Sequence, residues 1–178
     1  MPQVRIPSVE DLVGLPPGEV ERQLIRLSRR MTARDALCLQ FRVEKAFCRL
    51  CFEGDLERVS YFLDGLPASL APLSGQLLEK SFGIGIAWAA YGDQHHVIEY
   101  ICQNLDDEAL LGNDFHHALD VLTPVGEALS GPGPWAPDGA VAAVCKVASE
   151  RNCPELMDVL EPFVDRALDR QISHQVQQ

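Results

Sequence analysis

The sequence has no apolar run of the roughly 20 residues that a membrane-spanning helix needs. Its start, MPQVRIPSVEDLVG, lacks the pattern of a secretion signal. Cysteines are also few, six in 178 residues, and without a signal peptide they are expected to be reduced and buried instead of paired. We therefore expect a cytoplasmic protein without a membrane partner. A secretion machinery that reads other signals could still deliver it into another cell as an effector.

Basic residues are scarce after residue 60. Residues 1–60 contain 10 Lys and Arg against 9 acids, a net charge of +1, whereas residues 61–178 contain 5 against 17, a net charge of −12; the sum is −11. A nucleic-acid surface needs clustered Lys and Arg, so this charge pattern predicts no nucleic-acid partner. One arginine stripe in the N-terminal part is either a solvated helix face or a contact for acidic groups of this chain or of a partner. It contains Arg22, Arg26, Arg29 and Arg30.

The alternating pattern of β-strands is missing too, and helical signals dominate. Thr32 and Asp35 have the spacing of a capping box, which predicts a helix from about Ala33 to Glu53 that ends at Gly54. Similar signals predict a short turn after Ser8 and further helices along the chain. In the first half these run from Pro16-Pro17 to Met31, from Leu56, and from about Gln76 to Gly92. In the second half they run from about Gln94 to Leu105, around Ala109, from Asp114 to Leu122, from about Gly139 to Glu150 with Asp138 as cap, and from Pro154. Ser130–Gly139, rich in Gly and Pro, is predicted to be a loop.

Two stretches of the chain resemble each other. LCFEGDLERVSYFL (residues 50–63) aligns with WAAYGDQHHVIEYI (residues 88–101), with Gly54 matching Gly92 at an offset of 92 − 54 = 38 residues. A weaker third copy, VASERNCPELMDVL, places Arg151 at the glycine position, 151 − 92 = 59 residues further on. Both glycines follow a helix and are therefore expected to adopt the left-handed conformation that ends one.

Each unit resembles the ankyrin repeat, in which a helix, a tight glycine turn and a second helix follow the pattern A-A-x-x-G-x-x-E-V-V-x-x-L-L. LTPVGEAL, residues 122–129, is similar to the T-P-L-H-x-A opening of such a repeat. The offsets between the copies exceed the roughly 33 residues of an ankyrin repeat, and the turn of the third copy lacks glycine. The resemblance implies an all-α fold of stacked helical hairpins, an ankyrin-like or irregular α-solenoid, whose units bury each other's apolar faces. The alternative is an irregular helical bundle.

The expected organisation is a single all-helical domain over residues 1–178, with N-terminal capping helices in 1–32, hairpin repeats in 33–168 and a frayed tail in 169–178. In the ankyrin family, partners bind the turns and the exposed inner face of each first helix. Carried over by position, this implies a partner-binding surface of Arg49, Glu53, Asp55, Trp88, Tyr91 and Asp93. Trp135, in the predicted loop, is either a lid on the core or an exposed anchor for a partner.

Two further motifs favour packing over chemistry. Cys48-x-x-Cys51 lies late in a predicted helix among apolar residues, which is typical of a core and not of a redox pair or a zinc site. GIGIAW, residues 83–88, lacks the third glycine and the preceding strand of a phosphate-binding fingerprint. Its small residues are expected to let neighbouring helices approach closely.

The histidine pairs His95-His96 and His116-His117 are weak candidates for a metal site. Adjacent residues on a helix point about 100° apart, so each pair offers at most one ligand to a shared ion. We predict no metal, no cofactor and no enzymatic activity, and expect a protein-interaction module or adaptor with a protein partner. There are two alternatives. The first is a self-associating bundle, which would form a homodimer and act as a chaperone-like adaptor or secreted effector. The second is an enzyme with a hydrolytic or metal site around the histidines.

Overall fold

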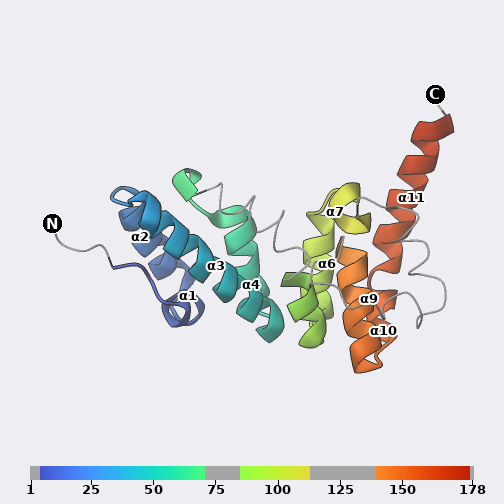
Figure 1. Ribbon diagram of the computed structural model, residues 1–178, viewed down its shortest axis with the longest axis horizontal. Coiled ribbons are helices and arrows are strands. Elements are labelled where there is room, and N and C mark those ends of the chain that lie inside the picture. The colour runs from blue at the N-terminus through green and yellow to red at the C-terminus, as the bar shows by residue number, and fades with distance from the viewer. Residues whose placement is uncertain (1–4, 71–84, 113–138, 177–178) are drawn as a thin grey trace.

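The computed structural model describes residues 5–70, 85–112 and 139–176, and every regular element within these ranges is a helix (Figure 1). The expected all-α fold is thereby confirmed. In chain order the elements are α1 (Val9–Gly14), α2 (Pro17–Ser28), α3 (Ala33–Glu53), α4 (Leu56–Ser60), the π-helix η1 (Tyr61–Gly65), the 3-10 helix η2 (Ala68–Leu70), a helix over residues 85–91, α6 (His95–Gln103), α7 (Asp107–Leu111), α9 (Ala140–Arg151), α10 (Glu155–Asp158) and α11 (Glu161–Val176). Among these described helices, none is both long enough and apolar enough to cross a membrane.

Capping boxes fix where helices α1 and α3 begin. The Asp11 amide donates to Ser8 Oγ at 3.1 Å, and the Ser8 amide donates to the Asp11 carboxylate at 3.0 Å. Thr32 and Asp35 repeat this arrangement at the start of α3, with distances of 3.2 and 3.0 Å. Two otherwise unpaired backbone amides are satisfied at each site, which is why α3 starts at the residue that the sequence predicted.

The N-terminal segments are tied together through α3. Leu12 of α1, Leu24 of α2 and Leu39 of α3 are buried in one core. The Arg42 guanidinium donates to the backbone oxygens of Ile6 at 2.7 Å and of Pro7 at 3.0 Å, and so holds the chain before α1 against α3. Helix α1 therefore packs directly on α3, while α2 contacts η2 and shares the same core.

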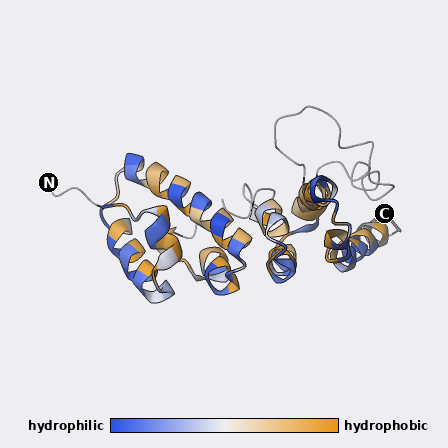
Figure 2. Ribbon diagram, turned by 90° about the horizontal axis from the view of Figure 1, so that it is seen from below, coloured by the Kyte–Doolittle hydropathy of each residue, from blue (hydrophilic) through white to orange (hydrophobic). Residues whose placement is uncertain are grey.

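From α3 to α11 the helices follow one another in chain order along the long axis of the molecule, with α1 and α2 at one end and α11 at the other (Figure 1). Contacts between helices join α3 to α4, α4 to α6, α7 to α9, and α10 to α9 and α11. Figure 2 shows the same row from below, with hydrophobic and hydrophilic residues alternating along the helices. This pattern is typical of amphipathic helices that bury one side against their neighbours.

The sharp turns after three helices use different residues. Gly54, after α3, has a φ of +78°, as the sequence predicted. The prediction was wrong for Gly92, because the left-handed residue of the second turn is Asp93, with a φ of 60°. Gly92 instead permits a close contact, since a Cβ there would lie 2.1 Å from the backbone oxygen of Phe52. In the third turn the left-handed residue is Asn152, with a φ of 52°.

The last predicted helix differs from the sequence prediction in two ways. The helix expected from Pro154 onward is interrupted after Asp158 and resumes as α11, which extends to Val176, inside the tail that was expected to fray.

The N-cap of α9 is Gly139, with a φ of 106° and no capping side chain. A Cβ at Gly139 would lie 2.6 Å from the amide nitrogen of Gly112, so the start of α9 is fixed by backbone packing.

Several predictions lie outside the described residues. They are the start of the helix at Gln76, the helix Asp114–Leu122, the Thr123-Pro124 match to a repeat opening, the pair His116-His117, the cap Asp138 and Trp135 in its loop.

Candidate functional site

Helix α3 has two apolar faces. The inner face is buried in the core and consists of Leu39, Val43, Ala46, Phe47, Leu50 and Cys51. The outer face carries Leu37, Phe41 and Phe52, whose exposed fractions are 68%, 60% and 44%. Cys48 lies between them, and the spacing of residues 37, 41, 48 and 52 places all four on one side of the helix. A soluble helix usually has polar residues there, so this second face needs a physical explanation.

The helix over residues 85–91 lies beside the C-terminal half of this outer face. It contributes Trp88, which is 46% exposed and meets Phe52 edge-on, with ring centroids 5.9 Å apart. The approach depends on Gly85, because a Cβ there would lie 2.5 Å from the Phe47 ring. The expectation that the small residues of GIGIAW allow close helix packing is thus confirmed at Gly85.

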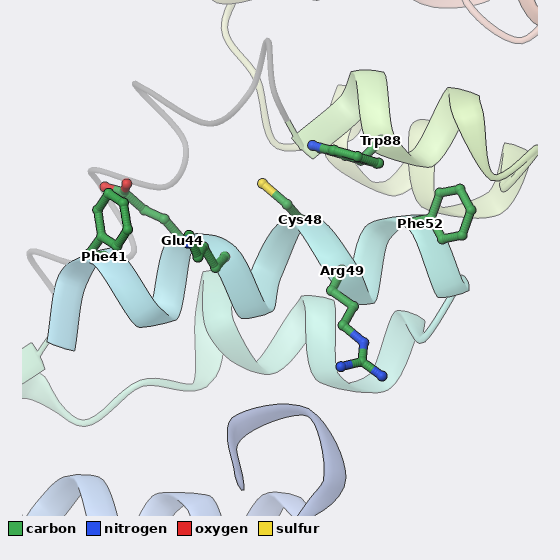
Figure 3. Close-up of a pocket in the computed structure, with 7 residues that line it drawn as sticks. Phe41, Glu44, Cys48, Arg49, Phe52 and Trp88 are labelled. Atoms are coloured by element: carbon green, nitrogen blue, oxygen red, sulfur yellow. The ribbon is translucent and has the colours of Figure 1, made fainter. Parts of the chain in front are cut away.

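Between these helices runs an open groove with a volume of about 490 Å³ (Figure 3). Figure 3 shows Phe41 at one end of the groove, Phe52 and Trp88 at the other, and Cys48 between them. Glu44, Lys45 and Arg49 complete its lining. The volume falls in the range of about 300–1,000 Å³ that is common for binding sites.

The charged groups of the groove have defined partners within the chain. Lys45 places its ammonium 4.9 Å from the centre of the Phe41 ring, a cation–π contact. Arg49 Nε donates to the Glu53 carboxylate at 2.8 Å. Gln40 Nε2 donates to Glu44 Oε1 at 3.0 Å. These contacts hold the charged side chains beside the aromatic rings.

The thiol of Cys48 is not activated as a nucleophile. Burial, followed by the nearby Glu44 carboxylate, raises the pKa of Cys48 to about 11. A thiol with such a pKa stays protonated at neutral pH and reacts slowly. Cys51, four residues from Phe47 on the same helix, is fully buried, and burial raises its pKa as well. The interpretation of this Cys-x-x-Cys motif as core packing is therefore confirmed for Cys51, whereas Cys48 is half-buried and lines the groove.

The six residues that the ankyrin resemblance implied as a partner-binding surface fall into two groups, one at the groove and one at the turns. Arg49 and Trp88 both line the groove, and Glu53 pairs with Arg49 at its edge. The other residues lie at the turns. Asp55 caps α4, where its carboxylate accepts from the Arg58 amide at 3.1 Å and also pairs with the Arg58 guanidinium.

Tyr91 and Asp93 lie at the second turn. The Tyr91 hydroxyl donates to the Glu150 carboxylate, and the exposed Asp93 carboxylate lies 3.3 Å from His95 Nε2. The neighbouring His96 places its Nε2 2.9 Å from the Gly54 backbone oxygen. Within the part of the chain that the structure describes, no three His, Cys, Asp or Glu residues are close enough to hold a metal ion.

The turns contact one another in sequence order. Gln94 Nε2, at the second turn, donates to the Phe52 backbone oxygen at 3.3 Å. Arg151 Nη1, at the third, donates to the Ala90 backbone oxygen at 2.9 Å. Phe52 and Ala90 occupy equivalent positions, each two residues before its aligned glycine (54 − 2 and 92 − 2). In both cases, the next turn therefore satisfies a carbonyl at the end of the preceding helix.

Sequence reasoning missed the residues that make the groove apolar, namely Phe41, Cys48 as a groove residue, and Phe52, together with Leu37 beyond it. A signal was present, because the steps of four and seven residues between them repeat on one helix side. The sequence predicts the inner side of this helix from the helical spacing of Ala36, Val43, Phe47, Leu50 and Cys51, and one apolar side was sufficient to predict an amphipathic helix.

Comparison with protein-family models, with curated proteins and with solved structures finds no match for this chain.

Proposed function

We propose that this protein is a non-enzymatic protein-interaction module, a stack of ankyrin-like helical hairpins that binds a partner protein through the groove along α3. The observation that carries the proposal is the cluster of exposed aromatic rings. Phe41, Phe52 and Trp88 are each 44–60% exposed and line one groove. Aromatic residues gathered at a concave surface are typical of the hot spots of protein interfaces.

The rigidity of α3 supports this role. The helix has 21 residues, and its inner face is buried along most of its length. The backbone of such a helix is already ordered before a partner binds, which lowers the entropic cost of association. A groove of this kind is therefore suited to recognition by shape and apolar contact.

The contacts between successive turns support the stacked arrangement. Phe52 and Ala90, at equivalent positions, each offer a backbone oxygen to the following turn, and Gly92 allows that approach. In repeat proteins, each unit contacts mainly its neighbours and leaves one continuous face open for binding. The six cysteines are all free, which fits a cytoplasmic location with its reducing conditions.

Affinity capture from the native cell tests the proposal. The groove variant combines Phe41→Ala, Phe52→Ala and Trp88→Ala, and the matched control is Ile172→Ala, which truncates a side chain that is 59% exposed on α11, outside the groove. We expect the groove variant to lose proteins that the wild type and the control recover. Recovery of the same proteins by all three would contradict the proposal.

A second variant tests the surface that the resemblance implied. It changes Glu53, Tyr91 and Asp93, which lie at the turns and outside the lining of the groove. Loss of partners in this variant, with the groove variant unaffected, would move the binding surface from the groove to the turns. Light scattering on the purified protein addresses self-association, because a dimer that dissociates in the groove variant would identify a second copy as the partner.

A further inference from the structure

We propose that the occupant of the groove is a second copy of this chain, which packs its own α3 antiparallel on the outer face and forms a two-fold symmetric dimer. The inference rests on the proposed function and names the partner. In such a dimer the same surface serves both copies, so it must be complementary to itself in shape and in charge.

The exposed apolar surface of the described residues is concentrated on this face. In the described ranges the exposed large hydrophobic side chains are Leu37, Phe41, Phe52, Trp88 and Ile172, and all except Ile172 lie here. A fully buried aromatic side chain covers about 150–250 Å², so the three half-exposed rings leave roughly 300 Å² per copy, or roughly 600 Å² for two copies. Because apolar atoms make up about 56–58% of a typical interface, the dimer would bury about 1,000 Å² in total, which is enough for a specific but weak interface.

The two halves of the face differ in shape. Leu37 and Phe41, in the N-terminal half, are more exposed than Phe52 and Trp88, in the C-terminal half. Figure 3 shows Phe52 and Trp88 together at one end of the groove, with Phe41 at the other end. One half therefore projects from the surface, whereas the other half is hollowed.

Antiparallel pairing brings a projecting half and a hollowed half together twice. Leu37 and Phe52 each lie 7.5 positions from the midpoint between residues 44 and 45, and Phe41 and Cys48 each lie 3.5 positions from it. A two-fold axis at this midpoint therefore places Leu37 of one copy over Phe52 of the other, and Phe41 of one copy over Cys48 of the other. Each Phe41 ring then enters the groove of the other copy, whereas a parallel pair would leave both grooves empty.

The charges of the groove allow two copies to meet. Glu44 and Lys45 lie at the midpoint, where each contacts a neutral group of its own chain and neither forms an ion pair within the described residues. Arg49 is paired with Glu53, so the groove has no net charge. The first 60 residues, which contain α3, carry +1, whereas the remainder carries −12. The copies therefore repel each other least through this part of the chain.

Sedimentation velocity on the full chain tests the inference. We expect a monomer near about 1 μM and a dimer near about 100 μM, as for a dissociation constant in the micromolar range. Phe41→Ala combined with Phe52→Ala should weaken the dimer at least about tenfold, because it removes two rings from the centre of the interface. The control Ile172→Ala, on α11, should leave the dimer unchanged.

Charge reversal at the midpoint supplies a test that a misfolded variant could not pass. Lys45→Glu gathers four carboxylates around the two-fold axis and Glu44→Lys gathers four ammonium groups, so each variant should weaken its own dimer about tenfold. An equimolar mixture of the two should recover dimers that contain one copy of each, because opposite charges then face each other. The control Arg26→Glu, on α2, makes the same change in net charge as Lys45→Glu and should leave the dimer intact. Circular dichroism verifies that each variant is folded.

Three outcomes would overturn the inference: a wild type that stays monomeric up to about 100 μM, a dimer that the Phe41→Ala, Phe52→Ala variant leaves intact, or charge variants that do not recover the dimer when mixed. If the inference fails while capture from the cell still depends on Phe41 and Phe52, the proposed function stands with a different protein as partner. A monomeric wild type whose groove variant captures the same proteins would reject the two proposals together.

Discussion

The two faces of α3 contain the same kinds of apolar residue, but one face is buried and the other is exposed. Phe47, on the inner face, is 2% exposed, whereas Phe41, six residues earlier on the outer face, is 60% exposed. The hydrophobic effect scales with the apolar area removed from water. The inner face therefore stabilises the folded chain, while the outer face leaves much of its apolar area in contact with water.

The exposed fractions of Phe47 and Phe41 distinguish residues that maintain the fold from apolar residues that the fold leaves accessible. An apolar stripe in a sequence indicates that one side of a helix is stabilised by contact with other apolar groups. Whether the same chain provides these groups depends on which neighbouring helices pack against that side. On α3 the core covers one side, and Trp88 borders only part of the other.

The largest expected effect contrasts the two phenylalanines directly. Phe47→Ala should lower the free energy of unfolding by about 3–5 kcal/mol, because it removes a buried ring and leaves a cavity. Phe41→Ala should change this free energy by about 0.5 kcal/mol or less, as is usual at exposed positions. Chemical denaturation of both variants provides the measurement. Similar losses for the two variants would show that the outer face is covered within the protein.

A second contrast concerns the turn glycines at the end of α3 and at the next turn. Gly92→Ala should destabilise the protein by about 2 kcal/mol or more, because its Cβ would clash with the backbone oxygen of Phe52, which cannot rotate away. Gly54→Ala should cost about 1 kcal/mol, because it must adopt a left-handed conformation and displace the Gln94 side chain. Thermal unfolding would compare them, and a larger effect at Gly54 would contradict close packing between the turns.

The equivalence of the two turn contacts provides a smaller test. Gln94→Ala and Arg151→Ala each remove a side-chain hydrogen bond to a backbone oxygen, of Phe52 and of Ala90. Each change should lower the free energy of unfolding by about 1 kcal/mol. The two contacts share no residue, so the double variant should be less stable than either single variant. A double variant no less stable than either single variant would show that the contacts are not independent.

The smallest expected effect is a dependence of stability on acid pH through the two capping boxes. Hydrogen bonds from the Ser8 backbone and side chain hold the pKa of Asp11 below its usual value, and Thr32 does the same for Asp35. A lowered pKa in the folded state contributes stability that is present above the unfolded pKa and is lost as the pH falls through the folded pKa. Stability should therefore decrease as the pH falls below about 4, and less steeply in the Ser8→Ala, Thr32→Ala variant. Identical profiles would contradict this origin.

The helix boundaries set by local signals were predictable from sequence. Thr32 and Asp35 satisfy backbone amides within one turn, and Gly54 ends α3 by adopting a conformation that glycine tolerates. Such signals act over a few residues and need no knowledge of distant contacts. The break between α10 and α11 and the continuation of α11 to Val176 were not anticipated from the apolar pattern, which continues across the break.

The site was predicted only in part, and the two turn glycines show why. Gly54 and Gly92 occupy aligned positions, yet one is required for its left-handed backbone and the other for its contact with Phe52. The sequence pattern is the same in both cases. Similarly, Arg49 and Trp88 were predicted through the repeat alignment, whereas Phe41 was not, because its exposure depends on which helices pack beside α3.

The sequence by itself determined the helical class, the starts of the first helices and the end of α3, because capping, glycine conformation and apolar spacing are local properties of the chain. Only the tertiary structure decided that the second apolar side of α3 stays exposed, and that Gly92 is needed for its contact with the end of α3 and not for the conformation of its own turn. These outcomes depend on contacts between residues about 40 positions apart, such as Phe52 with Gly92 and Gln94. Apolar residues have the same attraction for any apolar surface, and packing alone selects which surface they meet.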